Sequence, residues 1–243
     1  MHPVNDREDI PWPVRVAAPD LAHLSPRRLK LMGRAARVVE RITTDLEGCG
    51  VNVVADILRG HEAFTALEHY PPDDARDAAS GCSFFYHAHD PDRDEHGHFH
   101  PFVPLRSDDP GGDLLALPAI SMDVWGRPRA LFTVNQWVTG GSWLPAAPTI
   151  QHLNRYRMEH AYPSWLVNRW ITALLHLLRP HIEQLLWARD VAIRTVADGC
   201  TLEDVLADRR REVITWMPLD MDGLVNQIQS IQSQAGSLPP ASV

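Results

Sequence analysis

The chain has 243 residues, of which 44 % are hydrophobic and 22 % charged, and its formal net charge is −8. This composition is typical of a globular protein, and the length suits one large domain or two small ones. The acidic balance argues against a general nucleic-acid binder, because contact with phosphates needs a basic surface.

The cysteines and the apolar segments give expectations about location. Cys49, Cys82 and Cys200 are too far apart for a Cys-X-X-Cys motif and predict no disulfide framework. The N-terminal residues lack the basic and apolar segments of a secretory signal. No apolar run reaches the roughly 18–20 residues of a membrane span. We therefore expect a cytoplasmic protein with neither a membrane nor a nucleic acid as its partner.

The N-terminal part is predicted to contain an arm and two helices. Residues 1–24 are polar and rich in proline, so we expect an irregular arm that Trp12 holds on the domain. Ser25 followed by Pro26 is typical of a helix start, because a hydroxyl cap precedes a proline at the first helical position. A second helix is expected over residues 52–69, where two prolines follow and end it.

Residues 82–104 contain five of the chain's 13 histidines. Two aromatic segments flank the turn-forming sequence Asp-Pro-Asp-Arg-Asp, which predicts a β-hairpin. Side chains alternate between the faces of a strand, so an antiparallel register that pairs His87 with His98 or His100 brings all five imidazoles to one face. The five residues are His87, His89, His96, His98 and His100.

Such a histidine surface is suited to binding one metal ion. Neutral imidazole is the commonest metal ligand in proteins, and three histidines from two strands leave a coordination position open. Phe85 and Phe102 fall on the same face, which indicates partial burial, and several unpaired buried imidazoles would be costly. The alternatives are a hydrogen-bonded histidine network and a pH-sensitive surface.

Two more strands are expected after the hairpin, over residues 114–124 and 128–138. With them, residues 82–138 form an antiparallel meander of about four strands. Ser121 and Asp123 share one face of the third strand, so Asp123 could bind the metal or hold an imidazole through a hydrogen bond. Glu95, beside the histidines, is the second candidate carboxylate.

The C-terminal part, residues 149–233, is predicted to be helical. A long core helix is expected over residues 163–189, with a kink at Pro180. Residues 201–214 are expected to form a helix that opens with a capping box. Residues 237–243 are expected to be a disordered tail.

These elements predict a single α+β domain over residues 1–243. Its small antiparallel sheet is packed by helices from the N-terminal and C-terminal parts of the chain.

One short motif resembles the first metal motif of the cupin family. Gly81 is followed after five residues by His87-Ala88-His89, and after five more by Glu95. The spacing to Glu95 departs from the family pattern, and no second motif with a downstream histidine and asparagine is present. The resemblance implies a jelly-roll fold in which His87, His89 and Glu95 are ligands and a later histidine completes the site.

Four further segments resemble an uncharacterised bacterial protein family. They are residues 70–72, 85–89, 95–100 and 131–140. The resemblance spans most of the chain and supports treating the histidine hairpin as one unit. It implies no particular reaction.

We therefore expect a metal-binding protein, and foremost a metal-dependent enzyme with one iron, copper or zinc ion on the histidines. An oxidoreductase is favoured over a hydrolase, with Asp123 and Glu95 as catalytic carboxylates and an unidentified small molecule as substrate. One alternative is a non-catalytic metal or haem carrier or sensor, in which His176 or a hairpin histidine is the axial ligand. The other is a metal-free histidine network.

Overall fold

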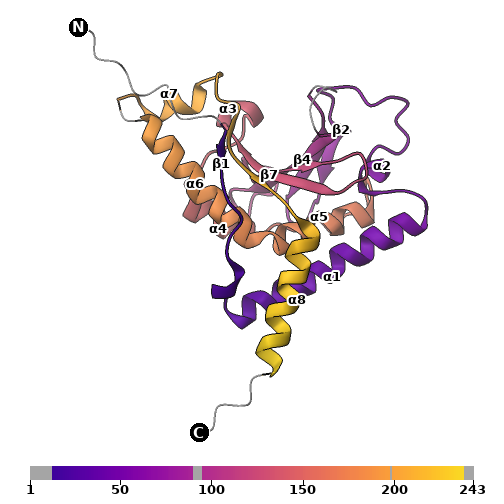
Figure 1. Ribbon diagram of the computed structural model, residues 1–243. Coiled ribbons are helices and arrows are strands. Elements are labelled where there is room, and N and C mark those ends of the chain that lie inside the picture. The colour runs from indigo at the N-terminus through magenta and orange to yellow at the C-terminus, as the bar shows by residue number, and fades with distance from the viewer. Residues whose placement is uncertain (1–12, 90–94, 198, 238–243) are drawn as a thin grey trace.

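The computed structural model describes residues 13–89, 95–197 and 199–237, and one sheet organises them (Figure 1). The strand order is β1-β8-β7-β6-β4-β3-β2, with β5 paired to β4. Neighbouring strands are antiparallel except for β1 and β8, which are parallel. The strands are β1 (Val14–Arg15), β2 (Tyr70–Arg76), β3 (Ser83–His87), β4 (Gly97–Pro104), β5 (Leu114–Ala116), β6 (Ala119–Met122), β7 (Pro128–Val134) and β8 (Val213–Pro218).

Eight α-helices and one short 3-10 helix accompany the sheet in the described part of the chain. They are η2 (Leu21–His23), α1 (Pro26–Gly48), α2 (Val53–Ile57), α3 (Gln136–Thr139), α4 (Ala146–Leu153), α5 (Trp165–Leu177), α6 (Arg179–Ala197), α7 (Leu202–Ala207) and α8 (Met221–Ser237). The α+β class is therefore confirmed. None of these helices combines the length and apolar character needed to cross a bilayer.

The predicted meander of about four strands is too small, because the sheet has eight. One additional strand arises because the single strand expected over residues 114–124 is divided into β5 and β6, and the other three come from segments that were expected to have other structures. β1 lies in the expected irregular arm, β2 begins where the expected helix over residues 52–69 should end, and β8 lies at the end of the expected helix over residues 201–214. The sequence Val-Ile-Thr-Trp of β8 is rich in β-branched and aromatic residues, which fit a half-buried strand.

The helix starts agree with the sequence, whereas several helix ends do not. Ser25 caps α1 through its hydroxyl, and Thr201 opens α7 with a capping box. The helix expected over residues 52–69 is too long, because α2 ends at Ile57. The strand expected over residues 128–138 ends at Val134, and α3 follows it. The long helix expected over residues 163–189 is divided at Leu178 into α5 and α6. Pro180 lies at the second position of α6, where its missing N–H needs no helical partner. Trp12, the hairpin turn and residues 238–243 of the expected tail lie outside the described residues.

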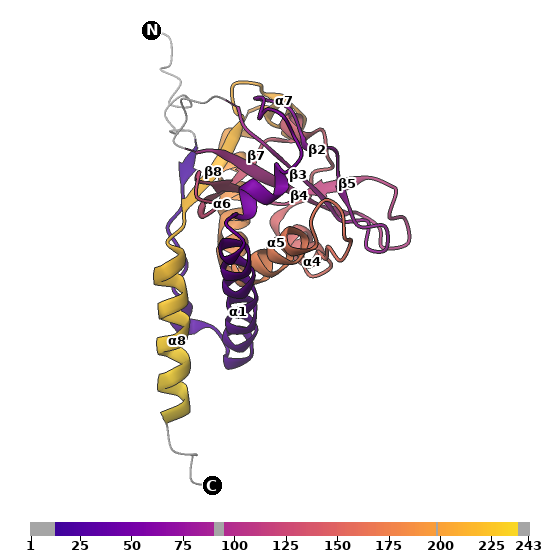
Figure 2. The ribbon, with the colours of Figure 1, turned by 90° about the vertical axis from the view of Figure 1, so that its right-hand side faces the viewer.

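The main hydrophobic core lies between one face of the sheet and a layer of helices. Figure 2 shows α1, α4 and α5 together on one side of the strands. Phe84, Tyr86 and Phe99 of the hairpin belong to this core, and the Phe99 ring lies 6.1 Å from the ring of Trp170 on α5. Because side chains alternate, the histidines of β3 and β4 project from the opposite face.

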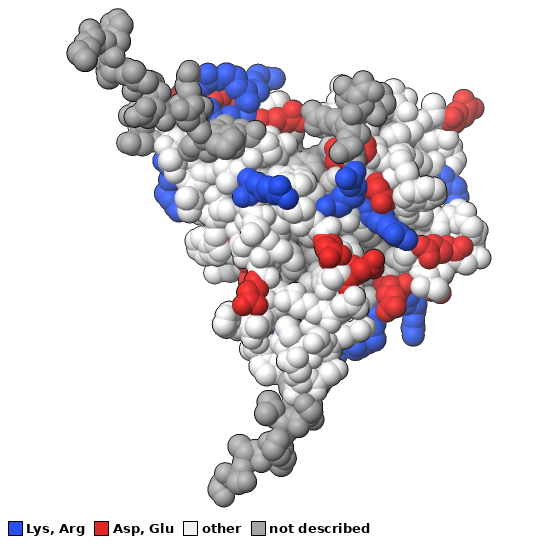
Figure 3. Space-filling model, in the orientation of Figure 1, with Lys and Arg blue, Asp and Glu red and all other residues white. Residues whose placement is uncertain are grey.

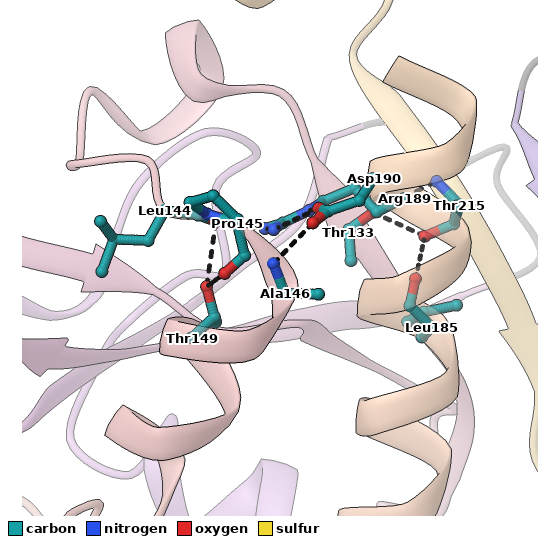
Figure 4. Close-up of polar contacts among 9 residues, drawn as sticks. All are labelled: Thr133, Leu144, Pro145, Ala146, Thr149, Leu185, Arg189, Asp190 and Thr215. Atoms are coloured by element: carbon teal, nitrogen blue, oxygen red, sulfur yellow. Dashed lines mark hydrogen bonds and ion pairs between the residues drawn. The ribbon is translucent and has the colours of Figure 1, made fainter. Parts of the chain in front are cut away.

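A buried polar network fastens α6 to the sheet and to α4 (Figure 4). Asp190 accepts hydrogen bonds from the Arg189 guanidinium and, at 2.6 Å, from the backbone N–H of Ala146. This contact satisfies a donor at the start of α4, which has no side-chain cap of its own. The hydroxyls of Thr133 and Thr215 are 2.6 Å apart, and Thr215 also donates to a carbonyl of α6. The helix layer is thus fixed independently of the histidine face.

The surface charges are mixed. On the face shown in Figure 3, acidic and basic side chains are interspersed, and no broad basic surface is visible there.

Candidate metal centre

The register of the hairpin brings three histidines together. β3 and β4 pair so that His87 lies opposite His98 and Phe85 lies opposite His100. The predicted pairing of His87 with His98 is therefore confirmed. The three side chains are almost completely buried, with exposed fractions of 8 % for His87, 2 % for His98 and 1 % for His100.

The ring nitrogens of these histidines converge on one point. One nitrogen from each of His87, His98 and His100 lies within 4.8 Å of the other two. The Nε2 atoms of His87 and His98 are 2.8 Å apart. Two nitrogens bound at about 2.1 Å to a tetrahedral ion lie about 3.4 Å apart, so these two would have to separate by only about half an ångström.

Glu95 contacts His98, one of these three histidines, through the ring nitrogen that does not face His87. Its Oε1 atom lies 2.9 Å from Nδ1 of His98, and Glu95 is half-buried just before β4 begins. A carboxylate at this position accepts the Nδ1 proton and leaves the lone pair of Nε2 directed at the other imidazoles. This carboxylate–histidine pair is the arrangement that commonly orients a metal-binding imidazole.

Burial keeps the imidazoles of His87 and His100 in the neutral form that binds metals. Removal from water, and after it the neighbouring His98, His89 and His69, together lower the pKa of His87 to about 3. Burial also lowers the pKa of His100 well below its usual value. Within the described part of the chain, Nδ1 of His100 is buried without a hydrogen-bond partner. A neutral imidazole with an unpaired ring nitrogen can coordinate a metal cation.

His89 and His69 lie beside the three converging histidines. The His89 ring is 4.9 Å from that of His87 and 5.3 Å from that of His98, and its Nε2 lies 3.6 Å from a carboxylate oxygen of Glu212. His69 stacks on Phe85 at 3.6 Å, and its ring is 5.7 Å from that of His87. Its Nδ1 lies 2.9 Å from the Asp74 carboxylate.

His69 is not among the predicted ligands, because it was expected to lie at the end of a helix. The local signal was the Tyr70-Pro71-Pro72 sequence, since a residue before proline favours extended backbone. Tyr70 in fact begins β2, which brings His69 beside the hairpin.

The structure separates His96 from the other four histidines, which corrects the expectation that all five share one face. Its Nδ1 lies 2.8 Å from the hydroxyl of Tyr86, and its ring stacks on Phe64 at 4.8 Å. His96 precedes the first residue of β4, so strand alternation does not control its direction. At Gly97 a Cβ atom would lie 2.6 Å from the carbonyl oxygen of His87 and 2.7 Å from the Tyr86 hydroxyl, so only glycine allows this close approach.

Asp123 occupies the turn between β6 and β7. Its Oδ1 accepts hydrogen bonds from the backbone N–H groups of Trp125 at 2.9 Å and Arg127 at 2.8 Å. Ser121 pairs directly with His98 across the sheet and is buried, so Ser121 is the polar residue of β6 that faces the histidines. The expectation that Asp123 holds an imidazole is replaced by this turn-forming role.

The ligand set implied by the cupin resemblance is also different. Glu95 bonds to His98, and the converging group contains His98 and His100 in place of His89 and Glu95.

A large open cavity adjoins the histidines. Near them it is lined by His89, Glu95, His98, His100, Ser121 and Phe132. The ring of Phe132 is 5.0 Å from that of His98 and 6.3 Å from that of His100. The whole cavity has a volume of about 1330 Å³ and extends past the ends of β7 and β8 to α1 and α8. A small molecule in it would therefore reach the histidine group.

Comparison with known proteins identifies a family but no activity. The family model described as a domain of unknown function (DUF6969) matches residues 33–219, which is 187 of the 243 residues. The chain therefore belongs to this family, and the expected membership of an uncharacterised family is confirmed. No curated protein and no solved structure matches the chain.

The buried histidines predict a specific pH dependence of stability. The pKa of His87 is about 3 in the folded protein and returns to about 6.5 on unfolding, so below pH 6.5 the unfolded state binds the proton first. In metal-free protein the free energy of unfolding should therefore fall as the pH drops from about 6.5 towards 3, by at most about 1.4 kcal/mol per pH unit for this one proton.

Chemical denaturation with a chelator present, repeated between about pH 4 and pH 7, measures this slope. His87→Gln should make the slope shallower, whereas His61→Gln, at an exposed position, should leave it unchanged. Equal slopes for His87→Gln and the parent protein would contradict this account of the site.

Proposed function

We propose that this family member binds one divalent metal ion through His87, His98 and His100 and works as a metal-dependent enzyme. The observation that carries the proposal is the convergence of three buried ring nitrogens within 4.8 Å. Burial favours neutral imidazole at His87 and His100, which is the state that coordinates a cation.

The residues present fit such an ion. Nδ1 of His100 is a buried polar atom without a partner in the described structure, and such atoms cost stability unless something satisfies them. A cation at the centre would replace the hydrogen bond between Nε2 of His87 and Nε2 of His98 by accepting a lone pair from each. Glu95 would then orient His98 and strengthen it as a ligand.

The donor set narrows the choice of metal. Imidazole nitrogens suit iron, copper and zinc, whereas magnesium and calcium prefer oxygen ligands. A bound iron or copper ion supplies redox chemistry with dioxygen, and a zinc ion supplies an activated water. Haem is less favoured, because His176, the helical candidate for an axial ligand, is exposed on α5.

The surroundings favour catalysis over storage, and an oxidoreductase over a hydrolase. Three histidines leave coordination positions open, and the cavity beside His98 and His100 gives a small-molecule substrate access to them. The two carboxylates expected to be catalytic are engaged elsewhere, Glu95 with His98 and Asp123 with a turn, so neither is free to act as a general base. Hydrolysis by activated water usually relies on such a base, which redox chemistry at the metal does not require.

A non-catalytic metal carrier is the second candidate, because His89 could complete the shell. Its ring lies close to two of the three converging histidines. His89→Ala separates the two functions, since it should weaken metal binding by a carrier whose shell includes His89 and leave binding by the other three histidines unchanged.

Metal content is the first prediction of this proposal. Elemental analysis of the purified protein, reconstituted with each ion in turn, should find about one equivalent of iron, copper or zinc. His98→Gln and His100→Gln should each lose the ion, because each removes one of the three donors.

His96→Gln is the matched control, since His96 is in the same hairpin but turns towards Tyr86. It should keep the full metal content, and circular dichroism should show that all three variants are folded. A parent protein that binds none of the three ions would refute the metal site, as would variants that bind as much as the parent. The cluster would then be a hydrogen-bonded histidine network.

The carboxylate behind His98 gives a second prediction. Glu95→Gln removes the negative charge next to Nδ1 of His98 and should weaken metal binding about 10–100-fold without changing the number of ions bound at saturation. Competition with a chromophoric chelator measures the affinity. Glu62→Gln, at an exposed position outside the cavity, is the control. An unchanged affinity in Glu95→Gln would show that Glu95 does not act through His98.

A further inference from the structure

The cavity meets the histidine group at a narrow end. Its outer part carries charges of both signs, from several carboxylates and from four arginines, Arg127, Arg129, Arg210 and Arg211. At the inner end the side chain of His89 is 20 % exposed, whereas His98 and His100 are 2 % and 1 % exposed. Solvent therefore reaches the rim of the histidine group but touches very little of His98 and His100.

Small side chains leave a passage beside His98. Ser121 on β6 lies opposite His98, and Ala130 on β7 lies opposite Ser121. Residues opposite each other in a sheet project from the same face, so Ser121 and Ala130 are on the histidine side. Both are buried and both line the cavity. Because a serine and an alanine fill little space above the sheet, the strip beside His98 connects with the cavity.

The ring of Phe132 narrows this passage. Phe132 is two residues after Ala130 on β7 and therefore projects from the same face. Its ring stands nearly perpendicular to both imidazoles, with centroids 5.0 Å from His98 and 6.3 Å from His100. On another side of His98, the ring of His89 stacks at 5.3 Å. A broad molecule in the cavity would meet these rings before it met the ligand nitrogens.

We propose that Phe132 is a specificity-determining residue of the metal centre. It admits narrow molecules such as water, azide or dioxygen to the open coordination position, and it stops planar rings and branched chains in the cavity. This inference rests on the proposed function, because the ion supplies the open position. A larger substrate then lies in the charged outer part of the cavity, and only a narrow end of it reaches the ion.

Modification by diethyl pyrocarbonate, a reagent much larger than water, tests the passage in metal-free protein. Burial lowers the pKa of His100, and its Nδ1 has no hydrogen-bond partner in the described structure, so its imidazole is a neutral nucleophile and only access limits its reaction. Mass spectrometry should find His100 modified at least about tenfold more slowly than the exposed His61. Phe132→Ala should accelerate the reaction of His100 at least about tenfold.

His181 on α6 is the internal control for unfolding. It is also buried, and its Nδ1 likewise lacks a partner in the described part of the chain, but it is not among the residues that line the cavity. It should stay unmodified in the folded variant, and Phe132→Val replaces Phe132→Ala if His181 becomes reactive. Unchanged modification of His100 in the variant, or modification of His100 in the parent as fast as that of His61, would overturn the inference.

Copper-loaded protein tests the same passage at the ion. Azide, a narrow linear anion, should bind and change the visible spectrum, and imidazole should bind at least about tenfold more tightly to Phe132→Ala than to the parent. Ser121→Leu should abolish azide binding with the copper content unchanged, because it fills the strip beside His98. Trp216→Ala, which removes a ring from another part of the cavity, is the matched control and should behave like the parent. Equal imidazole affinities of Phe132→Ala and Trp216→Ala would contradict the role of Phe132.

The result is separable from the fate of the metal site. Protein that binds one metal ion but whose His100 reacts as fast as His61 would refute the narrow passage and leave the proposed metal centre standing. Protein that binds no ion but whose His100 becomes reactive in Phe132→Ala would support the passage and refute the enzyme proposed above.

Discussion

The antiparallel pairing of His87 with His98 is the contact on which the site depends. A slip of one residue would send the histidines of one strand to the opposite face. The apolar face of the same hairpin prevents such a slip, because Phe84, Tyr86 and Phe99 are fully buried in the core. The hydrophobic effect on one side of the sheet thus fixes the geometry of the imidazoles on the other.

The two faces of the sheet have separate tasks. The helix side carries the main core and the Arg189–Asp190 network, which bind α4 and α6 to the strands without involving the histidines. The histidine side combines buried imidazoles, a supporting carboxylate and an adjoining cavity. Burying several polar rings costs stability. A fold tolerates this cost at a functional site, and the independently anchored helix layer supplies the stability that offsets it.

Local patterns predicted the hairpin, and long-range pairing explains what they missed. Alternation along two short strands was enough to place His87, His98 and His100 on one face. β8 pairs with β7 across some eighty residues of chain, a partner that no local pattern indicates. The direction of the His96 side chain was predicted wrongly. Gly97 lets the chain approach Tyr86 closely, and the His96 ring turns towards Tyr86 and away from the other histidines. Glu95, three residues before His98, supplies the carboxylate next to His98. Asp123 instead accepts hydrogen bonds within its own turn.

Anomalous X-ray scattering from crystals of the metal-loaded protein tests the central claim most directly. Data collected on either side of the absorption edge of the bound iron, copper or zinc locate the ion without assumptions about its ligands. We predict one peak about 2.0–2.2 Å from a ring nitrogen of each of His87, His98 and His100. A peak elsewhere on the protein, or a map in which Nε2 of His87 still bonds directly to Nε2 of His98 with no ion between them, would contradict the account.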